Sequence, residues 1–529
     1  MKRIVWSVSL VVSALLPIAA MAQQRNNEAV IQLQKLNRFY HYLQGMYVDT
    51  LQMAPLVESG IRSMLADLDP HSVYLTAEEM REQNESFEGE FSGIGVEYNI
   101  YRDSILIINI VDDGPSQRAG LKANDRIVAI NGENVVGIKR DDVAPKLRGL
   151  RGSVVRLGVA RRGEAGIRSY DVVRDNIPIT TIDAAFMADD GIAYIKVNRF
   201  GRTTMREFRD AMAQMQDAEA LILDLCSNGG GLLDQAVDLA GYFLPRQSLV
   251  TYIEGRTIAP EIYRSASGGE FDGRVVVLID EASASGSEIV AGALQDWDRA
   301  VIVGEDSFGK GLVQRQIPLG DGSAMRLTVA RYHTPSGRVI QRPYEKGHKD
   351  EYYKAHIDRL SGVQSDSVQN ALPEYRTLRS HRMVHGGGGI QPDERVESDT
   401  TRVSNYMARL VSQGVYNDFL MEYMDHYRSQ LDEQYPTFAE FERSFVLADE
   451  QLTMLINAAT KRNIEYKEKE YTLSKELIRT QLTAMIAQRL YSTSEFYRIM
   501  NPRENQAYKR AVEILKAWDE QGAKILAGQ

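Results

Sequence analysis

Strand-like apolar runs alternate with helical stretches between Gly191 and Tyr332, and this alternation restricts the fold more than any other feature of the sequence. Alternation of this kind is typical of an α/β core. The chain has 529 residues, of which 43% are hydrophobic, so it is long enough to form several cores and we expect further domains. The strand-like runs are Ile192 to Val197, Ala220 to Leu225, Arg274 to Ile279 and Ala300 to Gly304.

The regions on either side of this core have different patterns. From Glu28 to about Glu85, apolar residues recur at mostly helical spacing, which predicts an N-terminal helical cap. From Ser86 to Asp175, short β-branched runs between Gly, Asn and Asp residues predict a small β-rich module. The charged segment from Tyr344 to His385 indicates a surface insertion, and amphipathic helical stretches return from about Thr401. The expected division is 1–22, 23–85, 86–175, 176–400 and 401–529.

The first 22 residues have the pattern of a secretory signal peptide. Lys2 and Arg3 precede an apolar stretch that runs from Ile4 to about Ala19, and Ala20 to Ala22 form a small-x-small cleavage site. We therefore expect an exported protein of the bacterial periplasm. The apolar stretch is shorter than the roughly 20 residues that span a bilayer, so membrane association is expected only if the signal is not cleaved.

Composition argues against several other classes of protein. The net charge of -10 and the absence of a long basic run argue against a nucleic-acid partner. Cys226 is the only cysteine, so no intrachain disulfide can form and stability must come from packing. The eight histidines show no HExxH or Cys-His spacing, and we expect no metal and no cofactor.

One segment places a serine at the expected start of a helix. The run Arg274 to Ile279 leads into small residues around Ser285, and apolar residues then recur at helical spacing. Backbone N–H groups at a helix start are unpaired and can stabilise an oxyanion, and Gly286 would supply one of them. Ser285 and Glu288 also match a capping box, which requires no chemistry. Both interpretations stay open for this segment taken by itself.

A lysine between two glycines favours the chemical interpretation. Lys310 follows another strand-like run, and its flanking glycines allow close approach of the backbone. Burial lowers the proton affinity of a lysine, and a neutral amine can activate a serine. Gln314 could orient that amine, and Gly230 lies in a glycine cluster that could present a second oxyanion-stabilising N–H group.

Two other interpretations of these residues were weighed. The run from Gly304 to Lys310 matches the start of a phosphate-binding loop, but Gly311 stands where Ser or Thr should hold magnesium. We therefore reject nucleotide binding. A Ser-His-Asp triad that uses His333 stays open, because the members of a triad meet in space rather than along the chain.

Together these motifs resemble the carboxyl-terminal processing peptidases, which join a PDZ domain to a Ser/Lys peptidase core of the Clp and crotonase type. The resemblance implies a multidomain α/β protein with an N-terminal helical cap, a PDZ domain at 86–175, the peptidase core and a C-terminal helical domain. The segments that carry it are Leu68 to Ser72, Phe91 to Val96, Gly114 to Gly132, Ser283 to Asp296, Gly304 to Gln314, Thr334 to Arg338 and Gly389 to Asp393.

The resemblance also implies a role for each candidate site residue. It makes Ser285 the nucleophile, Lys310 its base and Gln314 the residue that orients Lys310. Gly286 and Gly230 would form the oxyanion hole through their backbone N–H groups. The roles agree with the chemistry argued from the residues themselves.

This chain departs from the family pattern next to the glycine cluster. The family usually shows Asp-Leu-Arg there, whereas this chain has Asp224, Leu225 and Cys226. Gly229 stands where proline is common. No arginine can therefore be given a role at this position.

The PDZ resemblance suggests how substrates are selected. A loop of backbone N–H groups would receive a peptide carboxylate, and the extended peptide would add as a strand. The expected function is a serine endopeptidase that cleaves exported proteins selected through free, apolar C-termini. A catalytically silent PDZ scaffold and a crotonase-like acyl-CoA enzyme are the alternatives; a homodimer and a regulatory partner stay open. The loop expected to receive the peptide carboxylate consists of Ser92, Gly93, Ile94 and Gly95.

Overall fold

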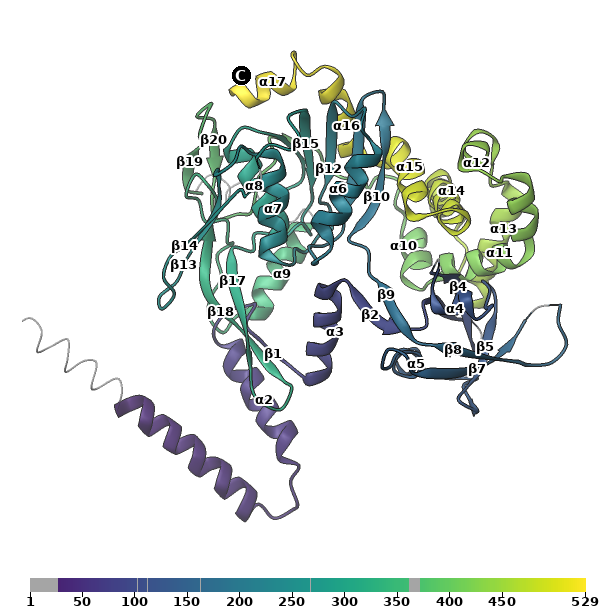
Figure 1. Cartoon of the computed structure of the whole chain (residues 1–529), viewed down its shortest axis with the longest axis horizontal. Coiled ribbons are helices and arrows are strands. Elements are labelled where there is room, and N and C mark those ends of the chain that lie inside the picture. Colours follow the sequence, from purple (N-terminus) through teal and green to yellow (C-terminus); the bar gives the residue numbers. More distant parts are fainter. Residues whose placement is uncertain (1–26, 102, 112, 162, 267, 361–371) are drawn as a thin grey trace, which may run out of the picture. The chain divides into compact units, whose positions relative to one another are not determined.

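The computed structural model describes residues 27–101, 103–111, 113–161, 163–266, 268–360 and 372–529 (Figure 1). The expected signal peptide, 1–22, lies outside the described residues. The chain divides into two compact units, one up to Leu68 and one from Asp69 to the end. Within the described ranges, no helix combines the length and the apolar character needed to cross a membrane.

The first unit is helical, as its pattern predicts. It contains a helix over residues 27–46 and α2 (Met53–Ala66).

A six-stranded sheet forms the centre of the second unit, in the order β10-β11-β12-β15-β16-β21. All its neighbouring strands are parallel except β10 and β11. Every residue of β11 and β12 is buried, which requires cover on both faces of the sheet. The α/β core is therefore confirmed. Its strands are β10 (Ile182–Asp189), β11 (Ile192–Val197), β12 (Ala220–Asp224), β15 (Arg274–Ile279), β16 (Val301–Gly304) and β21 (Glu394–Arg395).

Helices from distant parts of the chain cover the two faces (Figure 1). α6 (Thr204–Gln214), α7 (Leu233–Phe243) and α8 (Gly286–Asp296) share one apolar cluster with the sheet. α16 (Gln506–Lys516) contributes Tyr508 and Leu515 to the cluster on the opposite face. The last helices therefore belong in part to the α/β core.

A second sheet of the core carries the segment that follows Lys310. In this sheet β17 (Leu312–Pro318) pairs antiparallel with β18 (Ala324–His333), which also pairs with β1 (Val73–Leu75) and β13 (Leu249–Glu254). β13 in turn pairs with β14 (Glu261–Arg264). β1, which follows His71, and β17, which follows Lys310, pair with opposite edges of β18.

The β-rich module has a sheet with the order β3-β4-β5-β7-β8, and β6 (Glu133–Asn134) pairs with β5. β3 is an edge strand of this sheet. The module is joined to the core by a two-stranded ribbon, because β2 (Glu90–Gly93) pairs antiparallel with β9 (Asp175–Pro178). The five strands are β3 (Val96–Tyr101), β4 (Ser104–Ile110), β5 (Arg126–Ile130), β7 (Val154–Ala160) and β8 (Arg168–Val173); α5 (Val143–Leu147) packs in the same core.

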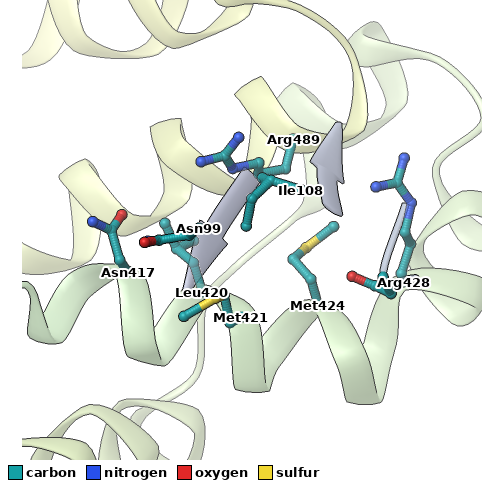
Figure 2. Close-up of a pocket in the computed structure, with 9 residues that line it drawn as sticks. Asn99, Ile108, Asn417, Leu420, Met421, Met424, Arg428 and Arg489 are labelled. Atoms are coloured by element: carbon teal, nitrogen blue, oxygen red, sulfur yellow. The ribbon is translucent and has the colours of Figure 1, made fainter. Parts of the chain in front are cut away.

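The C-terminal helices form a core of their own before the chain returns to the central sheet. α11 (Val415–Gln434) and α14 (Glu468–Leu490) contribute most of its buried residues. A pocket lies where these helices meet β3 and β4, with Met421 and Met424 beside Ile108 (Figure 2). Arg489 donates to both carboxylate oxygens of Glu97 at 2.9 Å. The other helices are α10 (Asn405–Ser412), α12 (Phe438–Ser444), α13 (Asp449–Lys461), α15 (Thr493–Glu504) and α17 (Gly522–Ala527).

The segment 344–385 consists mostly of exposed and half-buried residues where it is described, so the expected surface insertion stays a prediction. It contains α9 (Lys349–Leu360) and a hairpin of β19 (Glu374–Arg376) and β20 (Met383–His385). Tyr352 and Thr377 are buried in it. The many charged residues of the segment obscure the aromatic side chain that packs inward from α9.

Candidate active site

Ser285 stands at the junction between the turn after β15 and the start of α8. Its backbone has φ 56° and ψ -108°, a conformation that non-glycine residues rarely adopt. Such strain is on the order of 1–3 kcal/mol and persists only where the surrounding structure enforces it. The Ser283 hydroxyl donates to the Leu225 carbonyl at 2.8 Å and thereby ties this turn to the end of β12.

The capping interpretation of Ser285 accounts for only part of what the structure shows. The Glu288 carboxylate accepts the Ser285 N–H at 2.8 Å, as in a capping box. The Ser285 hydroxyl, however, makes no capping hydrogen bond to α8. The hydroxyl is therefore not committed to holding the helix end.

The buried carboxylate of Glu288 also holds the backbone around the predicted base. It accepts from the N–H groups of Gly309 at 2.7 Å and Lys310 at 2.9 Å, and from the Ser307 hydroxyl at 2.5 Å. Burial raises the pKa of Glu288, while these hydrogen bonds, together with that from Ser285, act to lower it. One carboxylate therefore fixes the main chain of Ser285 and that of Lys310 relative to each other.

The Lys310 side chain lies in a largely desolvated place. Burial lowers its pKa below the ordinary 10.5, and the charge of Arg326 acts in the same direction. Glu288 and Asp69 act to raise it. In the described part of the chain, no hydrogen bond joins the Lys310 ammonium to the Ser285 hydroxyl. The structure therefore brings the two segments together without showing a formed dyad.

The glycine cluster after β12 lies directly against Ser285. A Cβ atom on Gly230 would lie 2.8 Å from the Cβ of Ser285 and 2.8 Å from the Gly286 nitrogen. The Gly230 N–H donates to the side chain of Asn228 at 2.9 Å, whereas no acceptor among the described residues takes the Gly286 N–H. Of the two predicted oxyanion donors, Gly286 is available and Gly230 is already paired.

We expect Gly230→Ala to remove activity while leaving the fold intact at moderate temperature. The added methyl group would collide with the Ser285 side chain and with the backbone of Ala284 and Gly286 on either side of it, and Gly230 has φ 96°, which favours glycine. Turnover and circular dichroism measured on the same preparation test this. Gly229→Ala is the control, because a Cβ there meets nothing within 4 Å. Equal activity in the two variants would contradict the prediction.

The structure places Gln314 near Lys310 but gives its amide another partner. The Gln314 amide nitrogen donates to the carbonyl of His71. Lys310 precedes β17, which contains Gln314, and the irregularity in the pairing of β17 with β18 falls at Val329 of β18. The orienting role of Gln314 therefore stays a prediction.

His71 lies close enough to Lys310 for the lysine charge to affect its pKa. Sequence reasoning gave His71 and its hydrogen-bond partners no part in the site. The Asp69 carboxylate accepts the N–H groups of His71 and Ser72 at 2.9 Å each. Burial, followed by the charge of Lys310, lowers the pKa of His71 from 6.5 to about 4. The only sequence signal was the short motif from Leu68 to Ser72, which carries the resemblance but has no obvious chemistry.

Aromatic rings from the segment 344–385 close this side of the site. The Tyr352 ring of α9 meets the ring of His71 edge-on at 5.5 Å. The Arg342 guanidinium lies 4.5 Å from the ring of Phe308 and 4.6 Å from that of Tyr352. Phe308 is two residues from Lys310, so α9 packs on the segment that carries the predicted base.

His333, the alternative triad member, has partners elsewhere. Its ring stacks on Tyr252 at 4.5 Å, its Nδ1 lies 3.2 Å from the Gly337 carbonyl oxygen and its Nε2 lies 3.7 Å from Glu254. None of these contacts involves Ser285. They account for His333 without a catalytic role.

Of the predicted carboxylate loop, Ser92 and Gly93 belong to β2 and pair with β9, and Ile94 and Gly95 connect β2 to the edge strand β3. The Ile94 carbonyl accepts the N–H and the hydroxyl of Ser116 at 3.0 and 2.6 Å. The Gly95 carbonyl accepts the Val111 N–H at 3.0 Å, and Gly95 has φ 71°. The carbonyls of this loop therefore point into the module, an arrangement that suits a loop whose N–H groups face a ligand.

Three family descriptions match separate parts of the chain. Residues 191–348 match Peptidase family S41, residues 106–161 match the PDZ domain, and residues 406–492 match a family of unknown function. The first range contains strands β11 to β16 of the central sheet in sequence order, and the second lies within the β-rich module.

Curated relatives extend the match across both modules. A carboxy-terminal-processing protease of Bartonella bacilliformis is 35% identical over 350 residues, which cover 64% of this chain and 80% of that protein. This chain belongs to the carboxy-terminal-processing protease family. A second processing protease, CtpB of Bacillus subtilis, is 32% identical and is covered over 69% of its length, against 62% of this chain.

Solved structures of processing proteases are also similar in sequence. The photosystem II D1 C-terminal processing protease is 28% identical, with a TM-score of 0.33, and the match covers 56% of this chain and 81% of that one. The PDZ domain of a carboxy-terminal protease from Vibrio cholerae, solved with a peptide, is 33% identical, with a TM-score of 0.16 and coverage of 17% and 97%. The fold class expected from the sequence, a processing protease with a PDZ domain, is confirmed by the family matches.

Proposed function

We propose that this processing protease is an active endopeptidase in which Ser285 is the nucleophile and Lys310 its general base. The observation that carries the proposal is the Glu288 carboxylate, which holds the backbones of both residues from a fully buried position. The strained Ser285 backbone and the lowered pKa of Lys310 support the same roles.

The proposed reaction proceeds through an acyl-enzyme. Neutral Lys310 accepts the Ser285 hydroxyl proton as the serine oxygen attacks the scissile carbonyl, and the Gly286 N–H stabilises the resulting oxyanion. The proton then passes to the leaving amine as the carbon–nitrogen bond breaks. Lys310 next takes a proton from water, hydroxide adds to the ester, and collapse returns the proton to Ser285 with release of the carboxylate product.

The PDZ module is proposed to choose the substrates. An extended peptide would pair with the open edge of β3, and its terminal carboxylate would meet the N–H groups of the loop from Ser92 to Gly95. Val96, Tyr98 and Ile100 pack toward the module's core on the same strand, which favours apolar terminal residues. We also propose that the substrates are exported proteins, because of the signal-like first 22 residues.

The proposal is tested with a loosely folded protein that ends either in apolar or in charged residues. We expect the parent to cut the apolar version faster and Ser285→Ala to cut neither, as read from the products by mass spectrometry. Cleavage by Ser285→Ala at the parental rate would reject the nucleophile. Retained peptide binding with no cleavage by the parent would favour the silent PDZ scaffold instead.

A further inference from the structure

A buried lysine contacts the chain just before the glycine cluster, and the proposed reaction does not use it. Lys196, on β11, is 7% exposed and lies opposite Asp224 of β12 in the parallel register. Its ammonium is 3.3 Å from the Asp224 carboxylate and donates at 2.7 Å to the Cys226 carbonyl. A buried lysine is rare unless it is paired, so this one needs an explanation.

The partners of Lys196 form a closed network at the end of β12. Asp224 accepts the Tyr194 hydroxyl at 2.5 Å and the Cys226 N–H at 2.8 Å. The ring of Tyr497, which comes from α15, lies 5.7 Å from the Lys196 ammonium. Each side of the ion pair therefore has a protein partner.

The network ends where the glycine cluster begins. After Cys226 the chain turns at Ser227, which has φ 58° and donates its N–H to the Asp280 carboxylate at 2.8 and 2.9 Å. The Asn228 side chain donates to the carbonyl of Val197, the residue after Lys196, at 2.9 Å. Strand β11 thus holds this loop at two points, one of which is the Lys196 side chain.

The loop held in this way is the one that touches the nucleophile. Asn228 accepts the Ala284 N–H at 2.9 Å and the Ser287 hydroxyl at 2.8 Å through its carbonyl, on either side of Ser285. Because Gly230 lies against Ser285 without room for a methyl group, a small movement of the loop would displace the Ser285 backbone.

We propose that Lys196 is a positioning residue, which holds the glycine loop and through it Ser285 by its bonds to Asp224 and to the Cys226 carbonyl. The inference rests on the proposed function of Ser285. Burial acts to lower the pKa of Lys196, but the charge and hydrogen bond of Asp224 act to raise it together with Cys226 and Tyr497. The pKa of Lys196 therefore lies above its ordinary value, and the side chain stays charged at neutral pH.

The test compares Lys196→Met, Lys196→Arg and the double variant Lys196→Met with Asp224→Asn. Lys196→Met is expected to lower kcat at least tenfold with KM changed less than twofold, and to slow the reaction of Ser285 with a serine-acylating probe by a similar factor. Lys196→Arg should recover part of kcat, because a guanidinium keeps the charge. Lys516→Met is the control, since Lys516 is exposed and pairs with Asp189 at the same sheet.

The double variant separates positioning from stability. It removes the buried unpaired carboxylate that Lys196→Met leaves, so its thermal midpoint should return toward that of the parent while kcat stays low. If kcat returned together with the thermal midpoint, or if Lys196→Met kept the parental kcat, Lys196 would be no more than structural. A Ser285→Ala variant that cleaves like the parent would overturn the proposed function itself, an outcome distinct from either of these.

Discussion

Lys310→Met is expected to lower kcat by on the order of a thousandfold or more, because it removes the group proposed to take the proton of Ser285 in the first half of the reaction and that of water in the second. Methionine fills similar space without a charge, so the buried site should keep its packing. Peptide binding by the PDZ module should not change. Steady-state cleavage and peptide titration on the same preparation test this, with the exposed Lys461→Met as the matched control. Parental turnover in Lys310→Met would rule out the Ser/Lys mechanism.

The pH dependence of the parent provides a second test of the same base. Only the neutral amine can accept the proton, so kcat/KM should rise with pH as Lys310 loses its proton. Because burial lowers the pKa of Lys310, the midpoint of this rise should lie below 10.5. Lys310→Met should lose the rise in whatever activity it retains. A midpoint at or above the ordinary lysine value would contradict the proposed environment.

Glu288→Gln should cause the second large loss, in stability as well as in activity. The carboxylate accepts four hydrogen bonds, whereas the amide can accept only at its oxygen and turns an NH2 group toward buried donors. Unpaired buried donors cost about 1–3 kcal/mol each, so the free energy of unfolding should fall by about 3 kcal/mol or more. We expect kcat/KM to fall at least a hundredfold, since Ser285 and Lys310 lose their shared anchor.

Glu207→Gln is a matched control for this effect. Glu207 lies in the first turn of α6, away from the site, and accepts the N–H and the hydroxyl of Thr181 at a single carboxylate oxygen, which a glutamine oxygen can replace. Urea unfolding should show a larger loss of stability for Glu288→Gln than for Glu207→Gln, and only Glu288→Gln should lose turnover at a temperature where both are folded. Equal losses of turnover would show that Glu288 acts through stability alone.

The sequence predicts the layers of this protein better than it predicts their contacts. The runs around Ile192, Ala220, Arg274 and Val301 appear as strands of one sheet, because continuous apolar runs with β-branched residues can hardly form anything else between helices. The placement of Ser285 at a helix start also follows from local pattern. These features depend on residues that are close together in the sequence.

The features that sequence reasoning missed all depend on long-range pairing. The capping box suggested by Ser285 and Glu288 is a local pattern, but the bonds from Glu288 to Gly309 and Lys310 join segments that no local pattern connects. Tyr352 looks like part of a charged surface helix until its contact with His71 is known. For the same reason the return of α16 to the central sheet could not be foreseen.

The ribbon of β2 and β9 makes the PDZ module an insertion whose two ends lie side by side. Residues Glu90 and Pro178 are paired in register, and so are Gly93 and Asp175. A short turn could therefore replace everything between the two strands and leave a hairpin. The specificity of such a protease would be exchangeable as a cassette, with a foreign recognition domain grafted at the same two residues and the catalytic sheet left untouched.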